Sequence, residues 1–116
     1  SVYKKFHETR IFDKEEVYPY LTEGIGEDII PKNVNFDIID HFEKVSDRDA
    51  ALMTRKLATE EGIFAGNSCG AAIAGALQLE SQIKSTDVVV IILPDHGSRY
   101  VGKVYNDDWM KKNNFL

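Results

Sequence analysis

A serine between two glycines is the clearest candidate for chemistry in the sequence. Residues 66–70 read Gly-Asn-Ser-Cys-Gly and match the G-x-S-x-G pattern of a hydrolase nucleophile elbow, with Ser68 as the nucleophile. Such an enzyme also needs an acid and a histidine, and Asp95 with His96 is the only suitable downstream pair. Adjacent residues project in different directions, so one could hardly orient the other while it also reached Ser68. A hydrolase is therefore the less favoured alternative.

A binding role for Ser68 needs no histidine. A helix is predicted to follow residues 66–70, and the first backbone N–H groups of a helix are free to bind a ligand at the positive end of its dipole. The other interpretation is that Ser68 is only an N-cap and that Gly66 and Gly70 allow close packing. The spacing of the residues leaves both interpretations open.

Local patterns predict the elements that would position Ser68. Ser46 and Asp49 have the spacing of a capping box, and apolar residues recur at helical spacing as far as Glu61. Gly62 suits a left-handed helix end. Residues 63–65 are predicted to form a short strand and residues 71–83 a helix, which makes a strand, turn and helix unit.

Residues 88–93 form the strongest predicted strand. They are apolar without alternation and mostly β-branched, as in a strand buried on both faces of a parallel sheet. Pro94 and Asp95 follow at the carboxyl end, where open α/β sheets bind ligands. Shorter strands are predicted at residues 20–22 and 34–38. A short helix is predicted at residues 1–8, and a terminal helix or strap at residues 100–116. We expect an α/β fold, a three-layer, open, mostly parallel twisted sheet with helices on both faces.

The amino-acid composition disfavours or excludes several classes of function. The chain has 116 residues, a size suited to one domain, and its net charge of −5 with scattered Lys and Arg disfavours nucleic-acid binding. No apolar run is long enough to span a membrane, and the N-terminus does not resemble a secretory signal, so we expect a cytoplasmic location. Cys69 is the only cysteine, which excludes an internal disulfide and a cysteine-based zinc site.

Four stretches of the sequence resemble segments of fold-type-II pyridoxal-phosphate enzymes, the cysteine synthase and cystathionine β-synthase family. They follow one another along the chain in the same order as in that family. Residues 61–72 resemble the family's E-G-x-x-x-G-x-S-x-G-A-A segment, and residues 23–26, with Ile29-Ile30-Pro31 following, its G-I-G loop. Residues 46–47 and 92–95 resemble the matching helix start and the final core strand with its loop. Glu23, Asp95 and the sequence Asp-Asp-Trp-Met at 107–110 favour the cystathionine β-synthase branch. Asn67 and Cys69 replace the smaller residues more often found beside the serine.

The resemblance implies roles for particular residues. Ser68 corresponds to the serine that hydrogen-bonds the pyridine nitrogen of pyridoxal 5′-phosphate. Gly24, Ile25 and Gly26 correspond to the loop on the substrate side, and Pro94 and Asp95 to the pyridine end of the pocket. Glu23 either faces the substrate or is a solvated loop acid. The alternatives to these roles are an ordinary turn at residues 24–26 and a strand terminator with a helix cap at residues 94–95. The implied reaction is β-replacement on serine or an activated serine by a thiol, homocysteine or sulfide, in a homodimer.

The residues that would complete that chemistry are missing from the sequence. The family's Schiff-base lysine, phosphate-binding Gly/Thr-rich loop and ring-hydroxyl asparagine have no counterpart here, and in the family they lie upstream. We therefore expect the chain to be the C-terminal part of one catalytic domain, without a second domain, and to be inactive alone, with the cofactor bound by the full-length enzyme. A first residue other than Met fits this expectation. The competing hypothesis is a non-enzymatic α/β module that binds a nucleotide or a partner protein.

Overall fold

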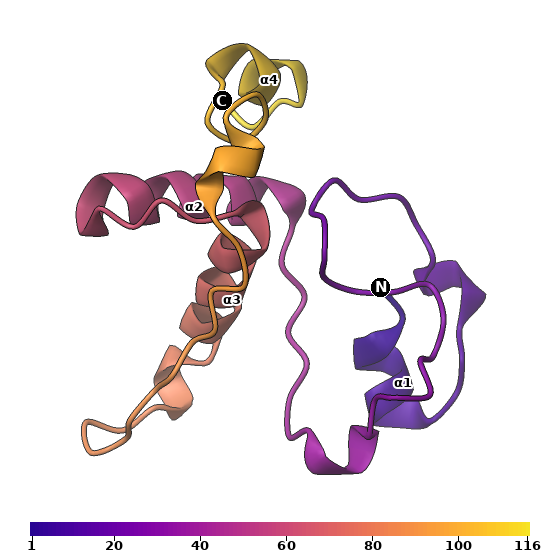
Figure 1. The fold of residues 1–116 in the computed structure, drawn as a ribbon. Helices are drawn as coiled ribbons and strands as arrows, with labels where there is room; N and C mark the ends of the chain where they lie inside the picture. The colour runs from indigo at the N-terminus through magenta and orange to yellow at the C-terminus, as the bar shows by residue number, and fades with distance from the viewer. The chain divides into compact units, whose positions relative to one another are not determined.

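The computed structural model describes residues 1–116, which form two compact units, Ser1–Lys44 and Val45–Leu116 (Figure 1). The first unit contains α1 (Tyr3–Thr9) and the 3₁₀ turns η1 (Lys14–Glu16) and η2 (Phe36–Ile38). The second contains α2 (Asp47–Glu61), α3 (Asn67–Gln78), η3 (Glu80–Gln82), η4 (Gly97–Tyr100) and α4 (Asp107–Lys112). None of these helices has the length and apolar character needed to cross a membrane.

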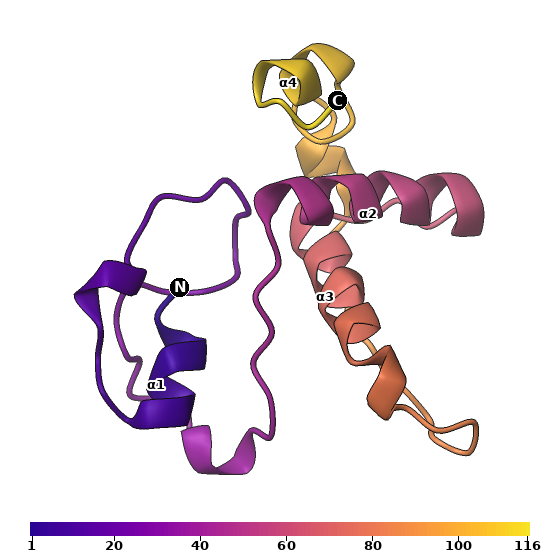
Figure 2. The same cartoon turned by 180° about the vertical axis from the view of Figure 1, so that it is seen from behind.

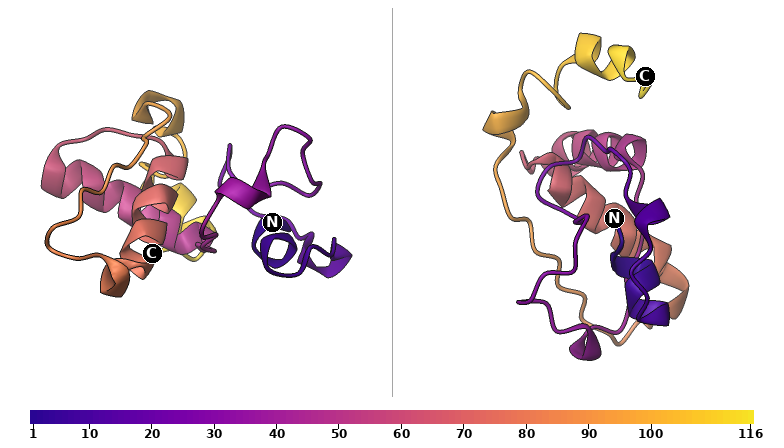
Figure 3. Two further views of the ribbon diagram at one scale, coloured as in Figure 1. Left: turned by 90° about the horizontal axis from the view of Figure 1, so that it is seen from below. Right: turned by 90° about the vertical axis from the view of Figure 1, so that its right-hand side faces the viewer.

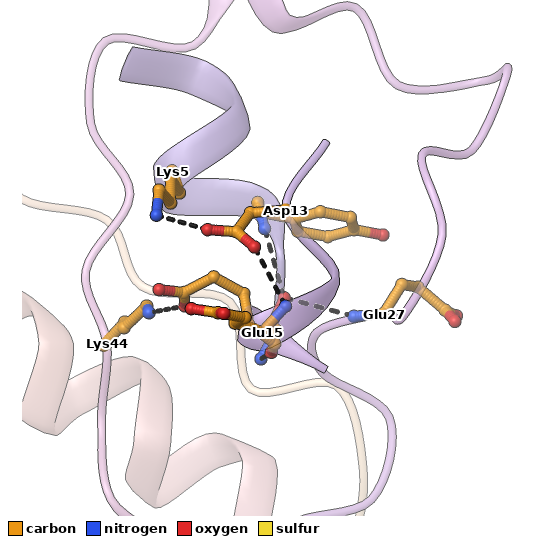
Figure 4. A network of polar contacts seen from close by, with 8 residues as sticks. Lys5, Asp13, Glu15, Glu27 and Lys44 are labelled. Carbon is orange, nitrogen blue, oxygen red and sulfur yellow. Dashed lines mark hydrogen bonds and ion pairs between the residues drawn. The ribbon is translucent and has the colours of Figure 1, made fainter. Parts of the chain in front are cut away.

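Aromatic rings form the interior of the first unit. Phe36 is buried, and its ring centroid lies 4.9 Å from that of Phe6 and 5.6 Å from that of Phe42. At the edge of the unit, Lys5 pairs with Asp13 and Lys44 pairs with Glu16 (Figure 4). The hydrogen bond from Lys5 lowers the pKa of the Asp13 carboxyl. Extended loops are thus held around a single short helix.

Helix α2 begins and ends as predicted. The Ser46 hydroxyl oxygen accepts the Asp49 N–H at 3.1 Å, and Gly62 ends the helix in the left-handed conformation with φ 68°. The buried face carries Ala50, Ala51, Thr54 and Leu57. This face packs against α3, which starts beside α2 in the views from both sides (Figures 1 and 2).

Helix α3 starts four residues earlier than predicted and ends earlier too. Gly66 is its N-cap, with extended backbone (ψ 172°), so the helix begins at Asn67 instead of Ala71. It ends at Gln78 and is followed by η3, instead of continuing to Ile83. Ser68 therefore lies in the first turn of the helix and not in a loop before it.

The predicted parallel sheet is not confirmed. The only β pairing is an isolated antiparallel bridge between Ala65 and His96, and residues 88–93 run back from the far end of α3 without a paired strand (Figure 3). Residues 20–22 form no strand, and Phe36–Ile38 forms η2 where a strand was predicted. A β-strand needs a neighbouring strand to pair with its backbone N–H and C=O groups. No other segment of the chain lies alongside residues 88–93 as a strand.

The C-terminal residues fold into a helix, one of the two forms predicted for them. Asn106 caps α4 by accepting the Trp109 N–H at 2.9 Å, and acidic residues begin the helix while lysines end it. Asn114 (φ 58°) follows, and the Phe115 N–H donates to Met110 O at 2.9 Å, which closes a Schellman motif. Met110 packs in a core cluster that also holds Ala51, Tyr100, Val104 and Phe115.

Candidate functional site

Ser68 is buried at the start of α3. It is the second residue of the helix and is only 4% exposed, among first-turn residues that include no acid. The Gly66 N-cap supplies no side chain to the free N–H groups of that turn. A neutral hydroxyl therefore lies where the helix dipole is positive.

The turn before Ser68 is bound to a segment thirty residues later in the chain. The Gly66 N–H donates to Asp95 O at 3.1 Å, and the Gly97 N–H donates to Phe64 O at 3.0 Å. The Tyr105 hydroxyl donates to Ala65 O at 2.6 Å, and burial raises the pKa of this tyrosine. The backbone on both sides of Ala65 is thus fixed by hydrogen bonds.

Asp95 lies directly beside this turn. Its carboxylate accepts a 2.5 Å hydrogen bond from the Tyr100 hydroxyl, and Cys69 Sγ lies 3.5 Å from Asp95 Oδ1. The structure thus brings two residues predicted for one end of the pocket, Ser68 and Asp95, to the same turn. Pro94, the third, is exposed next to them.

The four loop residues predicted for the substrate side lie together in the first unit. They line an open cavity of about 560 Å³, whose full lining is Tyr3, Tyr20, Leu21, Thr22, Glu23, Gly24, Ile25, Gly26 and Glu27. Gly24 (φ 80°) and Gly26 (φ 71°) adopt the left-handed backbone conformation that side chains disfavour. The loop sequence therefore produces a cavity carrying two carboxylates.

A serine-hydrolase triad is not formed. His96 Nδ1 lies 3.0 Å from Ser98 Oγ, while the Asp95 carboxylate is engaged by Tyr100. No hydrogen bond joins this acid to this histidine, and the triad requires one to orient the imidazole. The chain also holds no group of three or more His, Cys, Asp or Glu side chains arranged for a metal ion.

Sequence reasoning missed the roles of Thr54, Tyr100 and Tyr105 around this site. Thr54 is fully buried, and its hydroxyl donates to Ala50 O at 2.8 Å and lies 3.4 Å from Asn67 Oδ1, beside Ser68. From the sequence alone, the two tyrosines are expected to anchor a core or an interface. No local pattern indicates their hydrogen bonds, because the partners lie in segments distant in sequence.

Comparison with known proteins decides the family. The sequence profile of the pyridoxal-phosphate dependent enzymes matches residues 1–95. The chain belongs to this family. Pyridoxal phosphate is the family's cofactor, and the expected resemblance to fold-type-II enzymes is confirmed.

Similarity to individual proteins agrees with this family membership. The chain is 38% identical over 97 residues to a cystathionine beta-synthase of Dictyostelium discoideum, and 35% identical over 104 residues to that of Oryctolagus cuniculus. These matches cover 84% and 90% of this chain but only 20% and 19% of the relatives. The chain thus spans about a fifth of the length of these curated relatives.

Solved structures share the arrangement of the backbone. O-ureido-L-serine synthase superposes with a TM-score of 0.71 at 30% identity, over 82% of this chain and 33% of that one. A variant of a hydrogen sulfide-producing enzyme, in complex with an alpha-aminoacrylate intermediate, superposes with a TM-score of 0.67 at 36% identity, over 75% and 26% of the two chains.

Proposed function

We propose that the chain is part of a pyridoxal-phosphate-dependent β-replacement enzyme of the cystathionine β-synthase or cysteine synthase kind. The substrate would be serine or an activated serine, and the incoming thiol homocysteine or sulfide. The observation that carries this proposal is the position of Ser68, a residue only 4% exposed in the acid-free first turn of α3. The family and the names of its cystathionine beta-synthase relatives support it.

The first turn of α3 fits the pyridine nitrogen of the cofactor. Carbanion stabilisation is the chemistry that bound pyridoxal phosphate supplies. Ser68 would hydrogen-bond the nitrogen as a neutral partner, and the positive helix end disfavours a proton there. An aspartate at this position would instead favour the protonated ring. Ser68 therefore suits β-elimination and β-replacement, which need only a moderate electron sink.

The cavity of the first unit supports an amino-acid substrate. Glu23 and Glu27 both line it, and their carboxylates attract an ammonium group. The space beside Gly24 is open, because a Cβ there would meet nothing within 4 Å, so the backbone can approach a ligand at this position. Gly26 instead packs against the side chain of Ser1. We assign this loop to the substrate side, and Pro94 and Asp95 to the wall next to Ser68.

The remaining parts of the enzyme are assigned to residues outside this chain. We propose that these supply the Schiff-base lysine, the phosphate loop and the strands that complete an α/β sheet around residues 88–93. The chain would then be the C-terminal part of one catalytic domain, inactive by itself. A homodimer and a cytoplasmic location belong to the same proposal.

Replacement of Ser68 in the intact enzyme tests the proposal. We expect Ser68→Ala to lower kcat about tenfold, as for the loss of one hydrogen bond at the reacting group, and Ser68→Asp to lower it further and shift the cofactor absorbance. Ser81→Ala, an exposed serine on η3, is the matched control. Wild-type turnover and absorbance in both Ser68 variants would remove the proposed role.

A further inference from the structure

Asp95 and Tyr100 fill the space next to the glycine that caps α3. A Cβ on Gly66 would lie 1.9 Å from Asp95 Oδ1 and 2.6 Å from Tyr100 Cε2. Both distances are far below van der Waals contact, so these two side chains pack directly on the Gly66 backbone. Ser68 follows two residues later in the same turn.

Asp95 holds this turn through both its backbone and its side chain. Its carbonyl oxygen accepts the Gly66 N–H at 3.1 Å, and Cys69 Sγ lies 3.5 Å from that oxygen and from Oδ1. Residues on both sides of Ser68 are therefore in contact with Asp95. The carboxylate itself is fixed by the Tyr100 hydroxyl at 2.5 Å.

Tyr100 is in turn anchored in the core. Its side chain is 4% exposed and packs with Val104, Met110 and Phe115. The chain from Tyr100 back to Asp95 is short and includes η4, whose Gly97 N–H is bound to Phe64 O. The position of the Asp95 carboxylate is thus set by the core of the second unit.

We propose that Asp95 and Tyr100 form a positioning pair that fixes the Gly66 turn and so holds the Ser68 hydroxyl in place for the cofactor nitrogen. This inference rests on the function proposed for Ser68. It gives Asp95 a different task from contact with substrate. The carboxylate acts through Gly66 and Cys69 and does not touch the reacting atoms.

The thiol of Cys69 reports on the turn independently of catalysis. Its side chain is fully buried and covered by Asp95, so a reagent reaches it only when the turn opens. In the apoenzyme we expect Tyr100→Phe to raise the rate of Cys69 alkylation by iodoacetamide about fivefold, the factor expected for one lost hydrogen bond. Peptide mass spectrometry assigns the label to Cys69, and Tyr18→Phe, which removes the hydroxyl of a half-exposed tyrosine, is the control.

The holoenzyme gives the second measurement. We expect Tyr100→Phe to shift the cofactor absorbance in the direction of Ser68→Ala and to lower kcat with little change in KM. Asp95→Asn keeps an oxygen that can accept the hydrogen bond from Tyr100. Its cofactor absorbance and kcat should therefore lie closer to the wild-type values than those of Asp95→Ala. The double variant Tyr100→Phe/Asp95→Ala should lose little more kcat than Asp95→Ala alone, because both substitutions remove the same hydrogen bond.

Two results would overturn the inference. One is a wild-type alkylation rate of Cys69 in Tyr100→Phe, whatever Ser68→Ala does. The other is faster alkylation with unchanged cofactor absorbance in Tyr100→Phe while Ser68→Ala does change it, since the turn would then move without affecting Ser68. Failure of the proposed function is distinct, because it appears as unchanged absorbance in Ser68→Ala itself.

Discussion

The position of Ser68 depends on several other residues, and sequence patterns indicate only some of them. The G-x-S-x-G spacing indicates a tight turn before a helix, and it fits a hydrolase as well as a cofactor-binding serine. The partners of the turn, Asp95, Tyr100 and Tyr105, lie about thirty to forty residues away and come together only in the folded chain. The tight turn beside a helix could be predicted from the neighbours of Ser68 in sequence, whereas the contacts that hold this turn could not.

Glu23 provides a test of the cavity at the level of one residue. We expect Glu23→Gln in the intact enzyme to raise KM for the amino-acid substrate about tenfold with kcat nearly unchanged, because the Glu23 carboxylate would attract the ammonium group of the free substrate as it binds and would not contact the group that reacts. Steady-state kinetics with Glu80→Gln, an exposed acid on η3, as control would measure this. A change confined to kcat would assign Glu23 a different role.

The helices were predicted correctly where their signals are local. Ser46, Asp49 and Gly62 mark the two ends of α2, and each end is stabilised by groups close in sequence. The start of α3 was misplaced by four residues because Gly66 can cap a helix with its backbone alone, without the polar side chain that sequence reasoning looks for. A cap made by the backbone alone leaves no polar residue in the sequence to mark the start of the helix.

The contact between α2 and α3 depends on Gly70. A Cβ at this position would lie 2.1 Å from Thr54 Oγ1 and 2.3 Å from Ala50 O, the second a backbone atom that cannot rotate away. We expect Gly70→Ala to lower the free energy of unfolding by about 3 kcal/mol, as in overpacked cores. Denaturant unfolding of the intact enzyme measures it, with Gly102→Ala, where the added methyl group meets nothing within 4 Å, as control. Equal stability of the two variants would refute the close contact.

At the scale of the whole molecule, the predicted parallel sheet is the feature that the structure lacks. Residues 88–93 have the composition of a strand buried on both faces, yet Val88, Val90 and Ile92 are 89%, 81% and 79% exposed. Side-chain patterns predict that a segment will be a strand, but pairing requires backbone partners. The chain spans about a fifth of its curated relatives, and none of its own segments pairs with this one. Helices form from local hydrogen bonds, so they could be predicted where the sheet could not.

Amide hydrogen exchange on the intact enzyme tests the completed sheet. We expect the backbone N–H groups of residues 88–93 to exchange slowly, because strands supplied by the rest of the enzyme would accept their hydrogen bonds and exclude water from both faces. The adjoining exposed residues 85 and 86 serve as an internal control and should exchange fast. Equally fast exchange in both segments would show that residues 88–93 stay unpaired in the enzyme, and the proposal that they form a central strand would then fail.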